Sequence, residues 1–403
     1  MFDQIMGSIF ANVKPEILQW ARESAGFSLS EVAVAMDKSE DTLASWEKGS
    51  ASPTIPQLRK LAQLYKRPLG VFYLQEVPQG FQVISDFRRF PSGQPRHFSP
   101  QLTQEIRVAH QRRELALELL SDLGEEPKSF GLSFGLTVDS ETAGEMVRDF
   151  LGLSMSDMDA YRGDASGRKG LNSWRQRIEN VGVLVFQAAR ITSEEASGFA
   201  LAYDVLPIVV INRKDPPVRR LFSLAHEFVH LALRKSGVSD LDIDAIRPPE
   251  DNVIEVFCNR VAAAALMPSQ IFMTEPTITA HGTAMSWTDE EIATLANRYN
   301  VSREAVLLRL LTFDRTTRNF YQTKRNEYAE EYRRKKLLER ESSPSKPRPR
   351  NMPQEALSNF GRPFVEMILG NYYQDRLTLS EVSGYLDLRT QHVEKLQSKL
   401  GAH

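Results

Sequence analysis

The sequence contains a single cysteine in 403 residues, so no disulfide can form within the chain. This excludes a disulfide-stapled secreted scaffold and is compatible with a reducing compartment. No apolar run reaches the eighteen residues that predict a membrane-spanning helix, and the first residues lack the basic and apolar regions of a signal peptide. We therefore expect a soluble cytoplasmic protein with no membrane partner.

Charge of one sign is not in excess either, because the net charge is −2, and this value indicates no class of partner for the whole chain. Internal repeats and glycine-rich nucleotide-binding loops are absent. The length predicts two to four domains with ample residues for a sizeable core.

Histidine is scarce, yet two of the seven histidines stand in the motif His226-Glu227-x-x-His230, inside a strongly apolar run. On a helix, residues four apart lie on one face, so both imidazoles can reach one cation, and Glu227 is placed to act on a water bound there. Imidazole and carboxylate ligands suit zinc. The alternative is a core helix whose two histidines are satisfied by hydrogen bonds.

A third ligand is expected, because catalytic zinc sites usually have three protein ligands and one open position. The next strongly apolar helix, over residues 253–267, contains Glu255, whose buried carboxylate would be costly unless it is paired or bound to metal. Glu255 is therefore the best candidate. Cys258 follows one turn later, as a soft ligand, a redox-sensitive thiol or, as is usual for a lone buried cysteine, a small hydrophobic residue.

These segments resemble the ImmA/IrrE family of metallopeptidases, whose pattern is roughly RRFTLAHELGH followed by ExxANxFAxxLLMP. The chain matches this pattern at Arg219, Arg220, His226, Glu227, His230, Glu255, Asn259 and Met267-Pro268. Phe228-Val229 replaces the commoner Leu-Gly and Cys258 replaces the usual alanine, and neither change removes a ligand. The resemblance covers about residues 165–275. It implies that His226, His230 and Glu255 bind zinc and that Glu227 is the general base.

Three strands are predicted before the motif, over residues 181–186, 198–203 and 206–212. Pro207 places the last of them at a sheet edge or at its own first residue. In related zinc peptidases a sheet edge beside the active-site helix holds the substrate as an added strand. The plainer alternative is that this sheet only packs the helix.

The first 75 residues have a second recognisable organisation, a series of short helices separated by turn signals. Ser28-Leu29-Ser30-Glu31 is a capping box, and a further helix begins at Ser39 and ends at Gly49. With Trp46-Glu47-x-Gly49 and Pro53-Thr54, this segment resembles an Xre/Cro-type helix-turn-helix, which would place the helix from Ser39 in the DNA major groove.

Charge makes DNA binding less certain than the helix-turn-helix fold, since residues 1–75 contain eight basic and eight acidic side chains. Glu40 and Asp41 at the start of the recognition helix would repel phosphates. A module for protein contact or dimerisation is the alternative. The candidate DNA contacts are Lys38, Ser39, Thr42, Ser45 and Lys48.

The remaining segments are read as linkers and helices. The linker over residues 78–100 contains Asp86-Phe87-Arg88-Arg89, a motif that recurs in fused proteins of this type. Residues 288–306 have a helix-turn-helix rhythm with Ser302 as N-cap, and here we favour a structural role. Residues 315–350 contain twelve basic and five acidic side chains. Such a pattern is typical of a nucleic-acid contact or, more commonly, of a helix with a solvated charged face.

The sequence thus predicts an α+β multidomain protein: an all-α helix-turn-helix bundle, a zincin-like peptidase with a small sheet, and a helical C-terminal part. The predicted boundaries are a helix-turn-helix at 1–77, a linker and helical spacer at 78–164, a peptidase core at 165–275, a helical extension with a basic helix at 276–341, a linker at 342–353 and a helical tail at 354–403.

The function expected is that of a regulatory zinc endopeptidase. The family resemblance implies a narrow target, typically a helix-turn-helix repressor or antitoxin cleaved under stress or during mobile-element induction. The rival hypothesis is a transcriptional regulator or antitoxin whose peptidase fold senses without turnover. Candidate partners are a protein substrate, double-stranded DNA and a second copy of the chain. The fused helix-turn-helix would recruit the protease to DNA, pair with a similar repressor or itself be cleaved.

Overall fold

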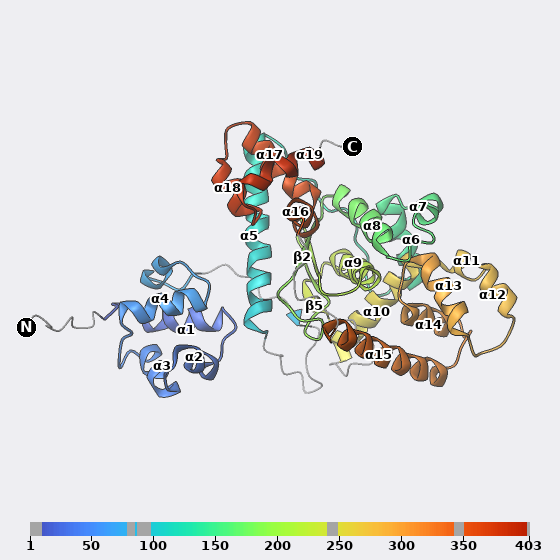
Figure 1. The fold of residues 1–403 in the computed structure, drawn as a ribbon, viewed down its shortest axis with the longest axis horizontal. Helices are drawn as coiled ribbons and strands as arrows, with labels where there is room; N and C mark the ends of the chain where they lie inside the picture. Colours follow the sequence, from blue (N-terminus) through green and yellow to red (C-terminus); the bar gives the residue numbers. More distant parts are fainter. Residues whose placement is uncertain (1–9, 79–84, 87–97, 240–248, 342–349, 401–403) are drawn as a thin grey trace, which may run out of the picture. The chain divides into compact units, whose positions relative to one another are not determined.

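The computed structural model describes residues 10–78, 85–86, 98–239, 249–341 and 350–400. The chain divides into two compact units (Figure 1). Unit one comprises residues 1–83 and 96–111, and unit two comprises residues 84–95 and 112–403. Helix α5 (Pro100–Leu123) begins in unit one and ends in unit two.

Unit one contains a helical bundle. The hydrophobic core of this bundle includes Trp46, Tyr65 and Phe72. Three of its helices begin at a residue whose side chain caps the helix. Ser28 forms the predicted capping box with Glu31, and the hydroxyls of Ser39 and Thr54 cap the next two helices. The elements are α1 (Pro15–Glu23), α2 (Leu29–Met36), α3 (Glu40–Glu47), α4 (Ile55–Leu64) and the 3-10 helix η1 (Leu69–Tyr73).

Unit two is built on a five-stranded mixed sheet in the order β1-β5-β3-β4-β2. The strands are β1 (Ser85–Asp86), β2 (Leu184–Ala188), β3 (Gly198–Leu201), β4 (Ile208–Asn212) and β5 (Gly237–Ser239). β3 is antiparallel to both β4 and β5, whereas β2 is parallel to β4 and β1 is parallel to β5.

The three strands predicted from sequence are present, but the edge position offered for Pro207 is wrong. β4 lies inside the sheet between β3 and β2. Pro207 directly precedes its first residue, where its carbonyl accepts a hydrogen bond from the Leu184 amide. A proline outside the paired residues removes no donor from the ladder, so the strand can be central.

Helices pack around the sheet and build the core with it. α9 (Pro217–Ala232) packs against β3 and β4, and it also contacts α8 (Arg168–Asn180) and α10 (Pro249–Leu266). α6 (Ser140–Leu151) packs closely on α10. On β2 lies α16 (Met352–Phe360), and α17 (Arg362–Tyr373) places the ring of Phe364 edge-on against Phe186. The C-terminal helices therefore pack on the same sheet as α9, the helix that contains His226 and His230.

The helix pair α13 (Asp289–Tyr299) and α14 (Arg303–Thr312) packs into the same core, and Ser302 caps α14 as predicted. Arg309, which is buried, donates to both carboxylate oxygens of Glu141 and to the carbonyl of Met267. These bonds tie α14 to α6 and to the end of α10. Such anchoring fits a structural role for this helix pair.

The other helices complete unit two, and the predicted α+β class is confirmed. None of the helices in the described ranges combines the length and apolar composition that a membrane-spanning segment requires. The helices that complete unit two are α7 (Met155–Ala160), α11 (Ser269–Phe272), α12 (Pro276–His281), α15 (Arg318–Glu341), α18 (Leu379–Tyr385), the 3-10 helix η2 (Thr390–His392) and α19 (Val393–Leu400).

A glycine sets the spacing between α6 and α10. A Cβ at Gly144 would lie 2.7 Å from the Cβ of Ala264 and 2.9 Å from the amide nitrogen of Ala265. We expect Gly144→Ala to force the helices apart and to lower the free energy of unfolding by about 1–2 kcal/mol, because the clash outweighs the better helix propensity of alanine. Urea titration of the full chain measures the change.

The matched control is Gly384→Ala in α18, where a Cβ would meet nothing within 4 Å. We expect this variant to gain about 0.5–1 kcal/mol of stability. Equal stabilisation by both substitutions would show that α6 and α10 are not in the close contact described.

Candidate metal centre

The motif His226-Glu227-x-x-His230 lies on α9, whose face toward the sheet is buried. Pro217 starts the helix at its first turn, where a missing amide hydrogen removes no helical bond. Every residue from Leu221 to Ala232 is buried, as the broad apolar face in the sequence predicts. His226, Glu227 and His230 are all fully buried, so α9 places two imidazoles and a carboxylate inside an apolar core.

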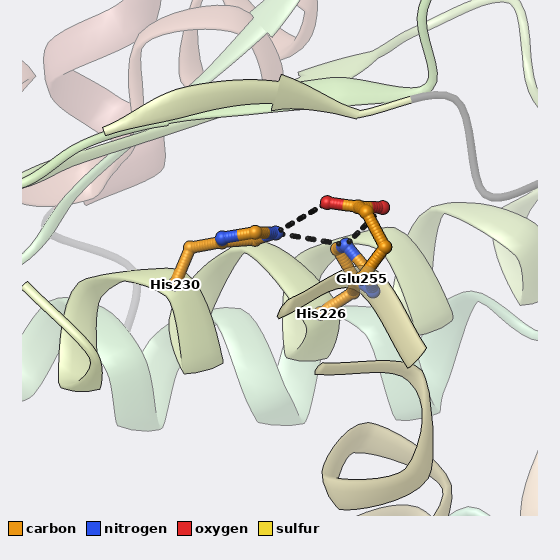
Figure 2. Close-up of side chains that lie close together, drawn as sticks. All are labelled: His226, His230 and Glu255. Carbon is orange, nitrogen blue, oxygen red and sulfur yellow. Dashed lines mark hydrogen bonds and ion pairs between the residues drawn. The ribbon is translucent and has the colours of Figure 1, made fainter. Parts of the chain in front are cut away.

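The structure brings His226, His230 and Glu255 together (Figure 2), as the sequence predicts. One ligand atom from each lies within 4.8 Å of the others. Nε2 of His230 is 3.1 Å from Nε2 of His226 and 3.0 Å from Oε1 of Glu255, and Nε2 of His226 is 3.4 Å from Oε2 of Glu255. A tetrahedral ion with bonds near 2.0–2.1 Å sets its ligand atoms about 3.3 Å apart, so the cluster fits one.

Glu255 comes from α10, and the same helix orients the first histidine. One turn after Glu255, Oδ1 of Asn259 lies 2.9 Å from Nδ1 of His226. An Nδ1–H that donates to this oxygen leaves the lone pair on Nε2, which faces the cluster. Asn259 therefore selects the tautomer of His226 that is able to bind a metal.

The two carboxylates of the site have opposite environments. Burial alone would raise the pKa of Glu255, but the imidazoles of His226 and His230 hold it well below its usual range. Burial raises the pKa of Glu227 well above its usual range, and the charge of Glu255 raises it further. Within the described residues neither carboxylate oxygen of Glu227 makes a hydrogen bond of ordinary geometry, and the nearby Ser239 hydroxyl lowers the pKa less than burial and Glu255 raise it. Glu255 is thus suited to stay ionised and bind a cation, and Glu227 to exchange a proton.

Two residues that sequence reasoning does not single out form the wall of the site. The Ser239 hydroxyl, at the end of β5, lies 3.3 Å from Nε2 of His230 and donates to Oε1 of Glu255 over the same distance. Gly198 on β3 leaves room for Glu227, because a Cβ there would lie 3.2 Å from its Oε1. A lone serine and a lone glycine in short strands carry no periodic signal, so only the fold shows their position.

Cys258 is placed as a hydrophobic residue. It is fully buried within the apolar core of unit two and is not part of the cluster of metal-binding groups found in the described ranges. Burial raises the pKa of its thiol well above the usual value, which disfavours the reactive thiolate. The alternatives of a soft ligand and a redox-sensitive thiol have no support in this geometry.

The candidate DNA contacts lie on and beside α3 in unit one. The Ser39 hydroxyl caps the helix and bonds to the Thr42 side chain, and the Ser45 hydroxyl donates to the Thr42 carbonyl. These hydroxyls therefore already have partners within the helix. Lys38 and Lys48, at the two ends of α3, are exposed.

Comparison with known proteins assigns two domains. Residues 178–311 match the family described as an IrrE N-terminal-like domain, and residues 18–72 match a helix-turn-helix family. A stretch of 105 residues is 34% identical to the radiation response metalloprotease IrrE of Deinococcus deserti, covering 26% of this chain and 35% of that protein. The chain thus spans about a third of the length of this relative. The predicted resemblance, an IrrE-like peptidase domain after a helix-turn-helix domain, is confirmed.

Replacing the partner of His226 tests the metal centre. We expect Asn259→Leu to weaken metal binding by about 10–100-fold, because residues that orient a ligating histidine contribute on this scale. Asn259→Asp keeps an acceptor and should retain most of the affinity. Competition with a chromophoric zinc chelator measures both variants.

The neighbouring Cys258→Ala serves as a control in the same helix, since the thiol is outside the cluster. Its metal affinity should equal that of the unmodified chain. Metal loss in this variant, or full affinity in Asn259→Leu, would contradict the assignment.

Proposed function

We propose that this chain, in which an IrrE-like peptidase domain follows a helix-turn-helix domain, is a cytoplasmic zinc-dependent endopeptidase that cleaves a helix-turn-helix repressor or antitoxin. The observation that carries the proposal is the fully buried carboxylate of Glu227, which stands on α9 beside the cluster of His226, His230 and Glu255. A metal site that serves structure alone does not require this group.

His226, His230 and Glu255 would hold the ion, with nitrogen and oxygen ligands that suit zinc. Bound zinc supplies a Lewis acid that polarises the scissile carbonyl and acidifies water. Glu227 accepts a proton from the attacking water as its oxygen bonds to the carbonyl carbon, and then delivers that proton to the amine nitrogen as the C–N bond breaks. The raised pKa of Glu227 suits both transfers.

A protein substrate with a helix-turn-helix is the target that the family resemblance favours. The helix-turn-helix of unit one supports this choice, since a domain of the same kind in the enzyme offers a way to pair with a regulator or to reach the DNA that the regulator occupies. Action on such a regulator also supports the cytoplasmic location.

Replacing the base separates catalysis from metal binding. We expect Glu227→Gln to retain the ion and the fold but to lose at least about 100-fold in cleavage, the usual contribution of a general base. The assay is co-expression with a candidate helix-turn-helix regulator, followed by mass spectrometry of the fragments and by zinc analysis.

Glu250→Gln is the matched control, because Glu250 is an exposed acid at the start of α10. It should cleave at the unmodified rate. Unchanged biological activity of Glu227→Gln would instead favour the second candidate, a regulator that senses without turnover.

The helix-turn-helix domain favours that second candidate as well, because it is a DNA-binding type of domain. If α3 contacts DNA, Lys38→Gln and Lys48→Gln should each weaken binding and lower the slope of log affinity against log salt by about one. Lys60→Gln, an exposed lysine on α4, is the control. Fluorescence anisotropy at several salt concentrations measures the slope, and equal effects at all three lysines would exclude α3 as the contact.

A further inference from the structure

β5, the second strand of the sheet after β1, lies next to the catalytic groups. Ser239, its last residue, contacts His230 and Glu255 through its hydroxyl. In the antiparallel pairing of β5 with β3, Ser239 stands opposite Gly198, whose backbone lies against Glu227. β5 and β3 therefore form the wall of the metal centre. An extended peptide that adds to the sheet beside this centre would pair with the outer side of β5.

That outer side is already paired with another part of the same chain. β1 is parallel to β5, with Ser85 opposite Gly237 and Asp86 opposite Val238, and it runs toward the Ser239 end. The opposite edge of the sheet, β2, is separated from β5 by β3 and β4 and is covered by α16. Among the described strands, the position beside the metal centre is thus taken by β1.

β1 is short, and its place in the sequence separates two segments of unit one. β1 lies in residues 84–95, a short segment of unit two that is flanked on both sides by segments of unit one, residues 1–83 and 96–111. The paired region is only two residues long, so few backbone hydrogen bonds hold it, and each such bond is modest in net strength. A strand this short can be displaced by a competing peptide.

We propose that Ser85–Asp86 and an extended peptide substrate compete for the same backbone groups of β5, so that the pairing of β1 with β5 restrains the peptidase. The identity of the competitor as a substrate rests on the proposed function. The occupation of the edge by β1 does not, and the two are tested by separate measurements.

The test removes the backbone pairing in the full chain. Ser85→Pro/Asp86→Pro eliminates both amide hydrogens of β1 and is incompatible with a paired strand. Ser85→Ala/Asp86→Ala keeps both amides and is the matched control. Circular dichroism and zinc content confirm that each variant is folded and loaded.

Two measurements do not depend on proteolysis. Hydrogen–deuterium exchange over residues 237–239 should be faster in the proline variant than in the alanine variant and the unmodified chain. A fluorescein-labelled synthetic peptide of residues 82–89 should bind the proline variant at least about tenfold more tightly than the other two, a difference that one or two backbone hydrogen bonds supply.

Cleavage of the co-expressed regulator is the third measurement, and it should rise by a similar factor of about ten in the proline variant alone. Equal exchange and equal peptide affinity in all three proteins would overturn the occupation of the edge by β1. A proline variant that binds the peptide more tightly yet cleaves at the unmodified rate would overturn the restraint. If the two binding measurements come out as expected and no variant cleaves any regulator, competition by an extended peptide is supported and the proposed proteolysis fails.

Discussion

Two carboxylates and two imidazoles share a buried site, and the surrounding structure is arranged to make that burial tolerable. His226, Glu227, His230 and Glu255 are all fully buried. Charged groups in such a position are costly unless they pair with one another or with an ion. The distances of 3.0–3.4 Å among His226, His230 and Glu255 are therefore a requirement of stability as well as of catalysis. The close packing of α6, α9 and α10 fixes these distances, and Gly144 permits the closest part of it.

The same burial assigns different roles to two chemically identical side chains. Glu255 faces both imidazoles, which keep its pKa low, whereas Glu227 faces an apolar core and the charge of Glu255, which raise its pKa. Environments that move the pKa values of two carboxylates in opposite directions suit one to bind a cation and the other to carry a proton. The surroundings of the two residues thus support the roles proposed for them.

Sequence reasoning succeeds here where the signal is local. The spacing of His226 and His230, the costly carboxylate of Glu255 and the caps at Ser28 and Ser302 follow from helix periodicity and capping, which depend on residues a few positions apart. The order of the strands depends on pairing between distant segments. β1 has two residues and β5 has three, too short for any periodic pattern, so neither β1 nor the place of Ser239 at the metal centre is predictable. The central position of β4 escapes prediction for the same reason, because Pro207 is equally compatible with an edge and with a strand start.

The length of β1 also limits what regulation through it can achieve. A ligand shifts an equilibrium only by the difference in its affinity for the two states. Any event that displaces β1 changes at most the free energy of pairing Ser85–Asp86 with Gly237–Val238, which is the contribution of a few backbone hydrogen bonds. Such a restraint produces a graded change of about one order of magnitude rather than an absolute block. Complete silencing of the peptidase would require a contact at the metal centre itself, where Glu227 lies buried beside Glu255.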